Sequence, residues 1–298
     1  MIALHHGRLE PPVTDASLLH ASATSEGEAI ALWAVEGNDR TWIVTRQSGS
    51  ATDSITLESS SDWTYPMVQA MPNGGALVAS KRCEWVDGFL QKNARHVSAD
   101  GDTLNEATLG DGINHMLTDA NGNVWVGFFD EGVYGDVGWE GEGHEFSPIG
   151  GPGLLRFDDS LTLSWSYSGE SSGYYIDDCY ALNVTDSEAI TCFYSDFVIA
   201  KVGREPTKYW KNEVAGASAL LVSDRLCALV GGYAGDGTRL AIGHFESNRF
   251  VVDREERLDT RALDKPAEQA WVVGRGPELH LFQGLEWSRW TLGESPTA

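Results

Sequence analysis

The sequence predicts an all-β fold made of repeated units. Helical periodicity is nearly absent along the 298 residues, and short apolar runs rich in Val, Ile, Leu, Trp and Tyr are separated by Gly, Asp, Asn and Ser. Such runs predict short strands joined by tight turns. Hydrophobic residues make up 42% of the chain, which is enough to bury a large core.

One pattern, a strand followed by a tight polar turn and a second strand, occurs six times. The segments start near residues 18, 66, 112, 178, 216 and 268, so they recur every 38 to 66 residues. Most are followed by two more strand-like runs, such as "RTWIVTRQ" with "SITLES" after the first. Four antiparallel strands per repeat are typical of a β-propeller blade. The sequence therefore predicts a single six-bladed β-propeller domain over residues 1–298, with a seven-bladed propeller or a pair of β-sandwiches as the alternatives.

The two ends of the chain are predicted to close the ring of blades together. The last repeat supplies only three strands, and the N-terminal run "IALHHGRLE" is left over. The simplest closure pairs residues 2–10 with the C-terminal blade as its outer strand, which removes an open sheet edge. Apolar and polar residues alternate only weakly along the inner strands, as expected where blades stack on both faces of each sheet.

The third repeat carries a family signature, "GINHMLTDANGNVWVGFFDEGVYG" (112–135). It resembles the repeat of two-component regulator propellers, in which an apolar strand precedes Asp-x-x-Gly and then an aliphatic residue, Trp, an aliphatic residue and Gly. Asp119, Gly122, Trp125 and Gly127 occupy those places. The resemblance implies a propeller in which Asp119 and Gly122 form the hairpin turn and Trp125 fills the gap between adjacent blades. It implies no sensor function, because neither a kinase nor a membrane helix accompanies the repeat.

The amino-acid composition of the chain argues against some classes of binding partner. The net charge of −23, from 21 basic and 44 acidic residues, argues against nucleic acid and anionic membranes, which require basic patches. No apolar run approaches the roughly 20 residues that cross a bilayer, and no signal peptide is recognised, so a cytoplasmic protein is expected. The four cysteines form no C-x-x-C pair, and three lie in apolar runs, which predicts buried free thiols.

Three long polar segments distinguish the second to fourth repeats: residues 81–93, 128–153 and 168–178. In a propeller blade, the loop between the second and third strands opens at the same rim as the connection to the next blade. All three segments are therefore expected to project from one rim. Long ordered loops of this kind commonly carry function, and drift in unconstrained loops is the alternative.

Acidic and aromatic side chains predominate in these segments. Residues 128–153 include six Asp or Glu and no Lys or Arg. Acids beside exposed rings can bind a cationic group or a sugar, and clustered carboxylates suit Ca²⁺. The predicted ligand-binding side chains are Lys81, Arg82, Trp85, Phe129, Tyr134, Trp139, Tyr174, Tyr175, Asp177 and Asp178.

Asp130 and Glu131 form the most informative candidate pair, because they directly follow a predicted strand. One carboxyl of the pair could act as an acid or base if its neighbour raises its pKa, and together the two could bind a metal ion. His115, in the innermost strand of the same repeat, is the third candidate catalytic residue. Lys81 and Arg82 end a strand of the neighbouring blade, where they could pair with Asp130 or orient an anionic group.

Two classes of function follow from these residues. The leading hypothesis is a ligand- or protein-binding propeller module whose partner is a small molecule, a sugar, a cationic ligand or a basic protein surface. The alternative is a metal-assisted hydrolase, lactonase or lyase with its site at the channel mouth and Ca²⁺ as its metal, by analogy of fold alone. A purely structural interaction scaffold is a third option.

Overall fold

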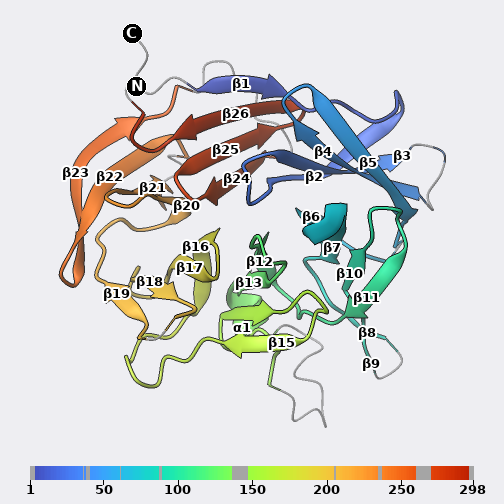
Figure 1. Cartoon of the computed structure of the whole chain (residues 1–298). Coiled ribbons are helices and arrows are strands. Elements are labelled where there is room, and N and C mark those ends of the chain that lie inside the picture. The colour runs from blue at the N-terminus through green and yellow to red at the C-terminus, as the bar shows by residue number, and fades with distance from the viewer. Residues whose placement is uncertain are drawn as a thin grey trace. The chain divides into compact units, whose positions relative to one another are not determined.

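The computed structural model of the chain describes residues 4–35, 37, 41–60, 62–86, 89–135, 147–204, 206–233, 237–259 and 270–294. The chain forms two compact units: a middle unit, Pro11–Cys179, and a terminal unit that joins Met1–Glu10 to Tyr180–Ala298. Each unit contains three four-stranded sheets (Figure 1). The six sheets make the chain a six-bladed β-propeller, which confirms the predicted fold class. The extent of a single domain over residues 1–298 stays a prediction.

The middle unit holds the first three blades. In chain order, their strands are β2 (Ala16–Ala23), β3 (Ala29–Val35), β4 (Thr41–Ser48) and β5 (Ala51–Glu58); β6 (Pro66–Ala70), β7 (Ala76–Ser80), β10 (Ala94–Val97) and β11 (Thr103–Ala107); and β12 (Ile113–Thr118), β13 (Val124–Phe128), β14 (Leu154–Phe157) and β15 (Leu163–Ser166). A separate two-stranded sheet, the 3-10 turn η1 and the helix α1 complete the unit: β8 (Trp85–Val86) with β9 (Phe89–Leu90), η1 (Pro72–Gly74) and α1 (Asp130–Tyr134).

The terminal unit holds the other three blades, and its first strand, β16, begins with the last two residues of the middle unit. In chain order, the strands are β16 (Asp178–Thr185), β17 (Glu188–Tyr194), β18 (Ile199–Val202) and β19 (Lys208–Trp210); β20 (Ala217–Val222), β21 (Cys227–Gly231), β22 (Arg239–Glu246) and β23 (Arg249–Arg257); and β24 (Ala270–Arg275), β25 (Glu278–Gln283) and β26 (Glu286–Thr291) with β1 (His5–Arg8). Every blade begins within two residues of its predicted start.

The predicted closure by the N-terminal strand is confirmed. β1 pairs antiparallel with β26, and His5 lies opposite Arg289. The backbone nitrogen of Leu9 continues the pairing by donating to the carbonyl oxygen of Leu285 at 2.8 Å. Leu4 and Leu9 are both buried. The last blade is therefore a four-stranded sheet built from both ends of the sequence, as Figure 1 shows at its upper edge.

The weak alternation along the inner strands has the predicted cause. All five residues of β7 are buried, but Ala76 and Val78 belong to one apolar cluster while Leu77 and Ala79 belong to another. In the terminal unit, β21 divides its apolar side chains between two clusters in the same way. A strand covered on both faces needs apolar residues at every position, so its sequence shows a continuous run.

The hairpin turn of the third blade forms as the family signature implies. One carboxylate oxygen of Asp119 accepts from the backbone nitrogens of Asn121, at 2.9 Å, and Asn123, at 3.0 Å. Gly122 has a φ of +85°, which favours glycine, and a Cβ there would lie 2.9 Å from the ring of Pro72. Trp125, which follows, is fully buried, and its ring centroid lies 5.5 Å from that of Trp165 in the same sheet.

Two further sequence predictions can be compared with the structure. All four cysteines are free and buried, as predicted. Across the ranges that the structure describes, no helix is long and apolar enough to cross a membrane.

Candidate functional site

The short helix α1 follows β13 directly and includes three of the predicted site residues, Asp130, Glu131 and Tyr134. It lies close to the turn before β12, because a Cβ on Gly132 would stand 2.4 Å from the carbonyl oxygen of Asp111. That turn has its own glycine, Gly112, at a φ of +69°. The glycines therefore fix where the side chains of α1 lie.

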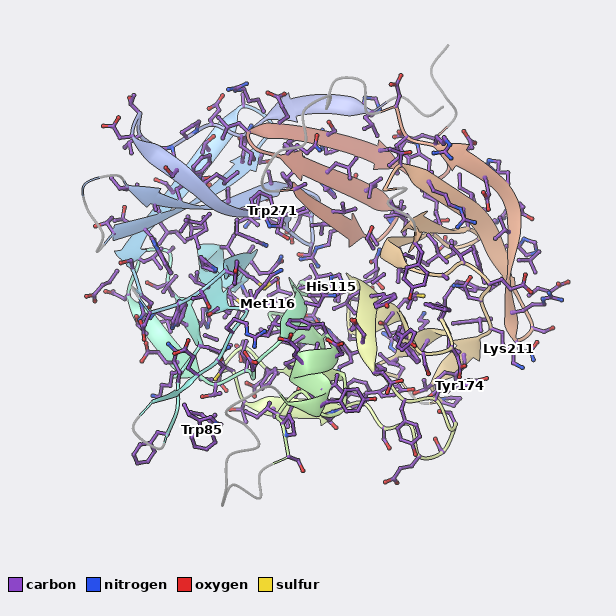
Figure 2. The ribbon with its side chains drawn as sticks, turned by 180° about the vertical axis from the view of Figure 1, so that it is seen from behind. Trp85, His115, Met116, Tyr174, Lys211 and Trp271 are labelled. Atoms are coloured by element: carbon purple, nitrogen blue, oxygen red, sulfur yellow. The ribbon has the colours of Figure 1, made fainter. Side chains whose placement is uncertain are left out.

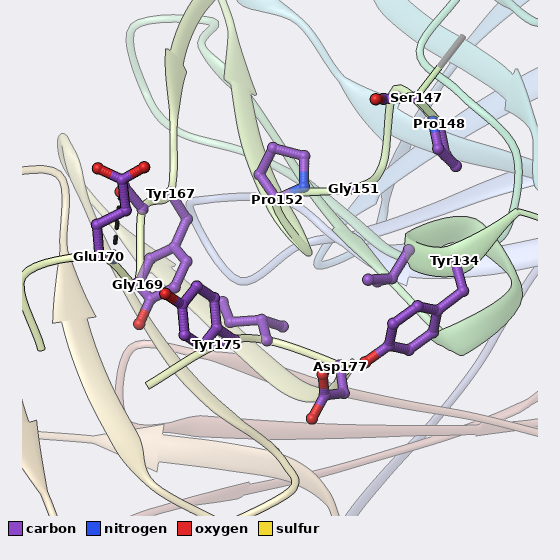
Figure 3. Close-up of a pocket in the computed structure, with 13 residues that line it drawn as sticks. Tyr134, Ser147, Pro148, Gly151, Pro152, Tyr167, Gly169, Glu170, Tyr175 and Asp177 are labelled. Atoms are coloured by element: carbon purple, nitrogen blue, oxygen red, sulfur yellow. Dashed lines mark hydrogen bonds between the residues drawn. The ribbon is translucent and has the colours of Figure 1, made fainter. Parts of the chain in front are cut away.

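A cavity opens where α1 meets the connection that leads out of the third blade. β13 and β15 run in the same direction, because β14 lies antiparallel between them, so the segments after both strands leave the same end of the sheet. The cavity between these segments has a volume of about 580 Å³ (Figure 3). Its lining residues are Val133, Tyr134, Ser147, Pro148, Gly151, Pro152, Tyr167, Ser168, Gly169, Glu170, Tyr175, Ile176 and Asp177.

The lining combines tyrosine rings with carboxylates. The Tyr134 hydroxyl donates to Asp177, and Figure 3 shows the two side chains meeting at one side of the cavity. Tyr134 is 59% exposed and Tyr175 is 60% exposed, so both rings are accessible to a ligand. The Tyr167 hydroxyl donates to the carbonyl oxygen of Tyr174 at 2.8 Å, which fixes the connection against the blade. None of the described residues that line the cavity is Lys, Arg or His.

Asp178 follows the cavity lining and lies in an unusual environment. One of its carboxylate oxygens is buried and forms no hydrogen bond with any residue that the structure describes. Burial, and then the charge of Asp130, raise the pKa of Asp178 to about 6. The sequence prediction paired Asp130 with Glu131, whereas the structure brings Asp130 into electrostatic contact with Asp178.

Arg82 connects the second blade to α1. Its guanidinium bonds Asp111 at 3.0 Å and Glu131 at 2.5 Å, and it lies 5.7 Å from the centre of the Phe129 ring. Arg82 therefore neutralises Glu131 instead of Asp130. Burial lowers the pKa of Lys81, and the ammonium group of Lys81 forms no ion pair with a described residue.

Two other predicted residues, His115 and Trp85, are not among the described residues that line the cavity. His115 is half-buried in β12, opposite Gly127, and Figure 2 shows it well away from both Trp85 and Tyr174. Trp85 is part of β8, which pairs with β9. Trp139 lies outside the described residues.

A metal site at this position stays a prediction. Among the residues that the structure describes, no three His, Cys, Asp or Glu gather so that they could bind a metal ion. Four of the six acids in the segment 128–153 are outside those residues: Asp136, Glu140, Glu142 and Glu145. Of the two predicted calcium ligands, Asp130 is exposed and Glu131 forms an ion pair with Arg82.

Comparison with known proteins bears on the fold. No family model matches the chain, and no curated protein matches its sequence. A chain of the mitotic checkpoint complex is 10% identical, with 97% of this chain and 95% of that chain covered and a TM-score of 0.50. An inactive virginiamycin B lyase from Staphylococcus aureus, solved with quinupristin, is also 10% identical over 97% of this chain and 99% of that one, with a TM-score of 0.48.

A third similar structure is the extracellular domain of a hybrid two-component system from B. thetaiotaomicron. It is 11% identical, with 99% of this chain and 43% of that chain covered and a TM-score of 0.42. At 10% identity, the likeness to the chain of the mitotic checkpoint complex concerns the fold alone.

Several residues that shape the site were not predicted. Asp111 is buried and accepts from the backbone nitrogen of Cys83 at 2.8 Å as well as from Arg82, so it organises the base of the segment 81–93. Tyr167 and Glu170 line the cavity. Glu170 lies in the segment 168–178 but was not among the predicted ligand-binding residues, and Tyr167 stands one residue before that segment, where no motif marks it.

Proposed function

We propose that the middle unit binds a small ligand that carries a cationic group, in the cavity between α1 and residues 167–177. The observation that supports this most directly is the lining itself, in which Tyr134, Tyr167 and Tyr175 accompany two carboxylates without a basic side chain among the described residues. The volume of about 580 Å³ suits a small organic molecule.

The physical basis is complementary charge at a partly apolar surface. A cation over a tyrosine ring is stabilised by the ring quadrupole, by about 0.5–1 kcal/mol at an exposed site. A carboxylate adds a charge-assisted hydrogen bond when the cation has an N–H group. Asp177 can supply that bond from a fixed position, because Tyr134 already donates to it. Val133, Pro152 and Ile176 offer apolar contacts for the body of the ligand.

The test compares benzylamine with benzyl alcohol, which has nearly the same shape and no charge. Isothermal titration of the whole chain is expected to show benzylamine binding at least about ten-fold more tightly, which corresponds to about 1.4 kcal/mol. Asp177→Asn should weaken benzylamine by a similar factor and leave benzyl alcohol unchanged. Tyr175→Ala should weaken benzylamine by about two- to five-fold.

Matched surface changes provide the controls. Asp53 is exposed in β5, and Tyr65 is 72% exposed outside the cavity. Asp53→Asn and Tyr65→Ala should leave both ligands unaffected. Equal affinity for the amine and the alcohol, or binding that Asp177→Asn does not change, would contradict the proposal.

The enzyme alternative rests on Asp178. A carboxyl with a pKa of about 6 beside the carboxylate of Asp130 is suited to accept and return a proton near neutral pH. If this pair catalyses hydrolysis or elimination, activity on a panel of esters and lactones should be lost in Asp178→Asn, and its pH dependence should follow a group that ionises near pH 6. Calcium dependence can be measured in parallel by thermal unfolding of chelator-treated protein with and without millimolar Ca²⁺.

A further inference from the structure

Four aromatic side chains of the terminal unit, from β16, the end of β17 and the segments that follow β17 and β21, form a continuous cluster. The aromatic cluster consists of Tyr180, Tyr194, Phe197 and Tyr233. The ring of Tyr180 stacks on that of Tyr194, with centroids 6.1 Å apart and an interplanar angle of 26°. Phe197 lies edge-on to Tyr194 at 5.8 Å and to Tyr233 at 5.7 Å. Tyr194 and Tyr233 remain 43% and 55% exposed, so the cluster presents ring surface to solvent.

The backbone adopts unusual conformations to bring these rings together. Phe197 has a φ of +53°, a left-handed conformation that a bulky side chain rarely adopts. Gly216, at a φ of +74°, leaves room for the ring of Tyr233, since a Cβ there would lie 2.7 Å from that ring. Strained conformations of this kind persist where surrounding contacts impose them, and they are frequent at binding sites.

The chain between the rings of Tyr194 and Phe197 carries exposed polar groups. The Tyr194 hydroxyl, the Ser195 hydroxyl and the Asp196 carboxylate belong to exposed residues, and none of the three bonds to another residue that the structure describes. The hydroxyls of Tyr180 and Tyr233 lie 2.9 Å apart and form a hydrogen bond, so the polar ends of these two rings lie together. The same short loop therefore offers both ring faces and unused hydrogen-bonding groups.

We propose that the aromatic cluster is a binding site for a neutral oligosaccharide. A pyranose ring presents C–H groups on its faces and hydroxyls around its edge. Aromatic faces can cover the C–H groups, while a carboxylate and phenol or serine hydroxyls bond the edge. A peptide partner fits less well, because the cluster contains no aliphatic side chain, and a cationic ligand would use only one carboxylate, Asp196, and leave the hydroxyls unsatisfied. This site shares no residue with the described lining of the cavity beside α1 and does not depend on the function proposed there.

Saturation-transfer NMR on the whole chain tests the proposal, with maltotriose, cellotriose and N-acetylchitotriose as probes. At least one should bind with a dissociation constant in the millimolar range or tighter. Tyr194→Ala and Tyr233→Ala change exposed rings and should each weaken that binding at least about five-fold. Asp196→Asn, which alters no contact among the described residues, should weaken it by at least three-fold and is the variant least able to disturb folding.

The two proposed sites can be told apart with reciprocal controls. Tyr175→Ala lies in the cavity beside α1 and should leave the oligosaccharide titration unchanged. Tyr194→Ala should in turn leave benzylamine binding unchanged. Absence of saturation transfer to all probes would overturn the proposal, and so would transfer that persists at full strength in Tyr194→Ala, Tyr233→Ala and Asp196→Asn.

Discussion

At the scale of single residues, the two carboxyl groups that the structure brings together differ in their surroundings. Asp130 is exposed at the start of α1, whereas Asp178 has a buried oxygen without a hydrogen-bond partner among the described residues. Folding therefore places Asp178 where its charged form is less favourable than in water, and the charge of Asp130 adds to that effect. The consequence is a dependence of stability on pH that can be measured.

The free energy of unfolding of Asp178→Asn is expected to exceed that of the wild type above about pH 6. The folded-state pKa of about 6 lies above the value of about 3.9 for an unperturbed Asp, so the folded chain binds this proton more tightly. The stability from Asp178 is therefore complete below about pH 4 and is lost as the pH rises to about 6. After allowance for partial exposure, the difference at pH 7 should be about 1 kcal/mol. Urea unfolding from pH 3.5 to 8 checks this, and a difference that is constant over the range would contradict it.

The pairing of Arg82 with Asp111 belongs to the same scale. The Asp111 side chain is 6% exposed and that of Arg82 is 27% exposed, so loss of the guanidinium leaves a carboxylate buried without its cation. Arg82→Gln should therefore lower the free energy of unfolding by about 2–3 kcal/mol. Arg8 forms a comparable pair with Glu286 at 2.8 Å, but both side chains are largely exposed. Arg8→Gln should change stability by less than about 1 kcal/mol in the same urea titration. Equal effects of the two changes would mean that burial of Asp111 is energetically unimportant.

At the scale of elements, the position of α1 depends on close backbone packing. Gly132 lies against the turn around Gly112, and Val133 and Tyr134 then line the cavity. The carbonyl oxygens of Asp111 and Gly112 lie close to Gly132. They cannot move easily, because they belong to the backbone of the turn.

Gly132→Ala is expected to displace α1 and to abolish ligand binding in the cavity. The added Cβ would lie 2.4 Å from the carbonyl oxygen of Asp111 and 2.9 Å from that of Gly112, which is closer than real Cβ contacts. Overpacking of this kind costs about 1–3 kcal/mol. Gly237→Ala is the control, since no atom of the residues that the structure describes lies within 4 Å of its added Cβ. Titration with benzylamine and urea unfolding give the two measurements, and unchanged affinity in Gly132→Ala would contradict the expected displacement.

The elements also show what the sequence could and could not predict. Strand positions were predictable because each blade repeats a local pattern of a strand, a tight turn and a second strand. In the third blade, the side chain of Asp119 also bonds the backbone of its own turn. The ion pair between Arg82 and Asp111 was not predictable. Asp111 lies in a turn between two strands, and that turn has no repeat signature. The same holds for Asp130 and Asp178, which are distant in sequence and meet only once the third blade is complete. Contacts between residues that only packing brings together produce no periodic pattern in the sequence.

At the scale of the whole molecule, the last blade joins both ends of the chain. Without β1, the outer edge of β26 would lose its partner and expose backbone groups that can pair with another chain. The apolar contacts of Leu4 and Leu9 would be lost with it.

Leu9→Ala is therefore expected to destabilise the protein by about 2–4 kcal/mol, because Leu9 is 1% exposed. Removal of residues 1–10 should cost more and should promote association, which light scattering can detect. Val13→Ala provides the control, since Val13 is 43% exposed and its truncation should change stability by less than about 0.5 kcal/mol. If Leu9→Ala unfolds at the same urea concentration as the wild type, the closing strand contributes little to stability.

The pairing of β1 with β26 also has a consequence for biosynthesis. Arg8 and Glu286, which face each other in that pair, are 278 residues apart. At about 5–20 residues per second, a ribosome needs roughly 15 to 55 s to make the chain between them. During that interval β1 has no partner strand, so the nascent chain carries an unpaired strand flanked by the apolar residues Leu4 and Leu9 until the final blade emerges. Chaperone capture of the nascent chain should therefore depend on residues 1–10 and cease soon after the last blade has been made.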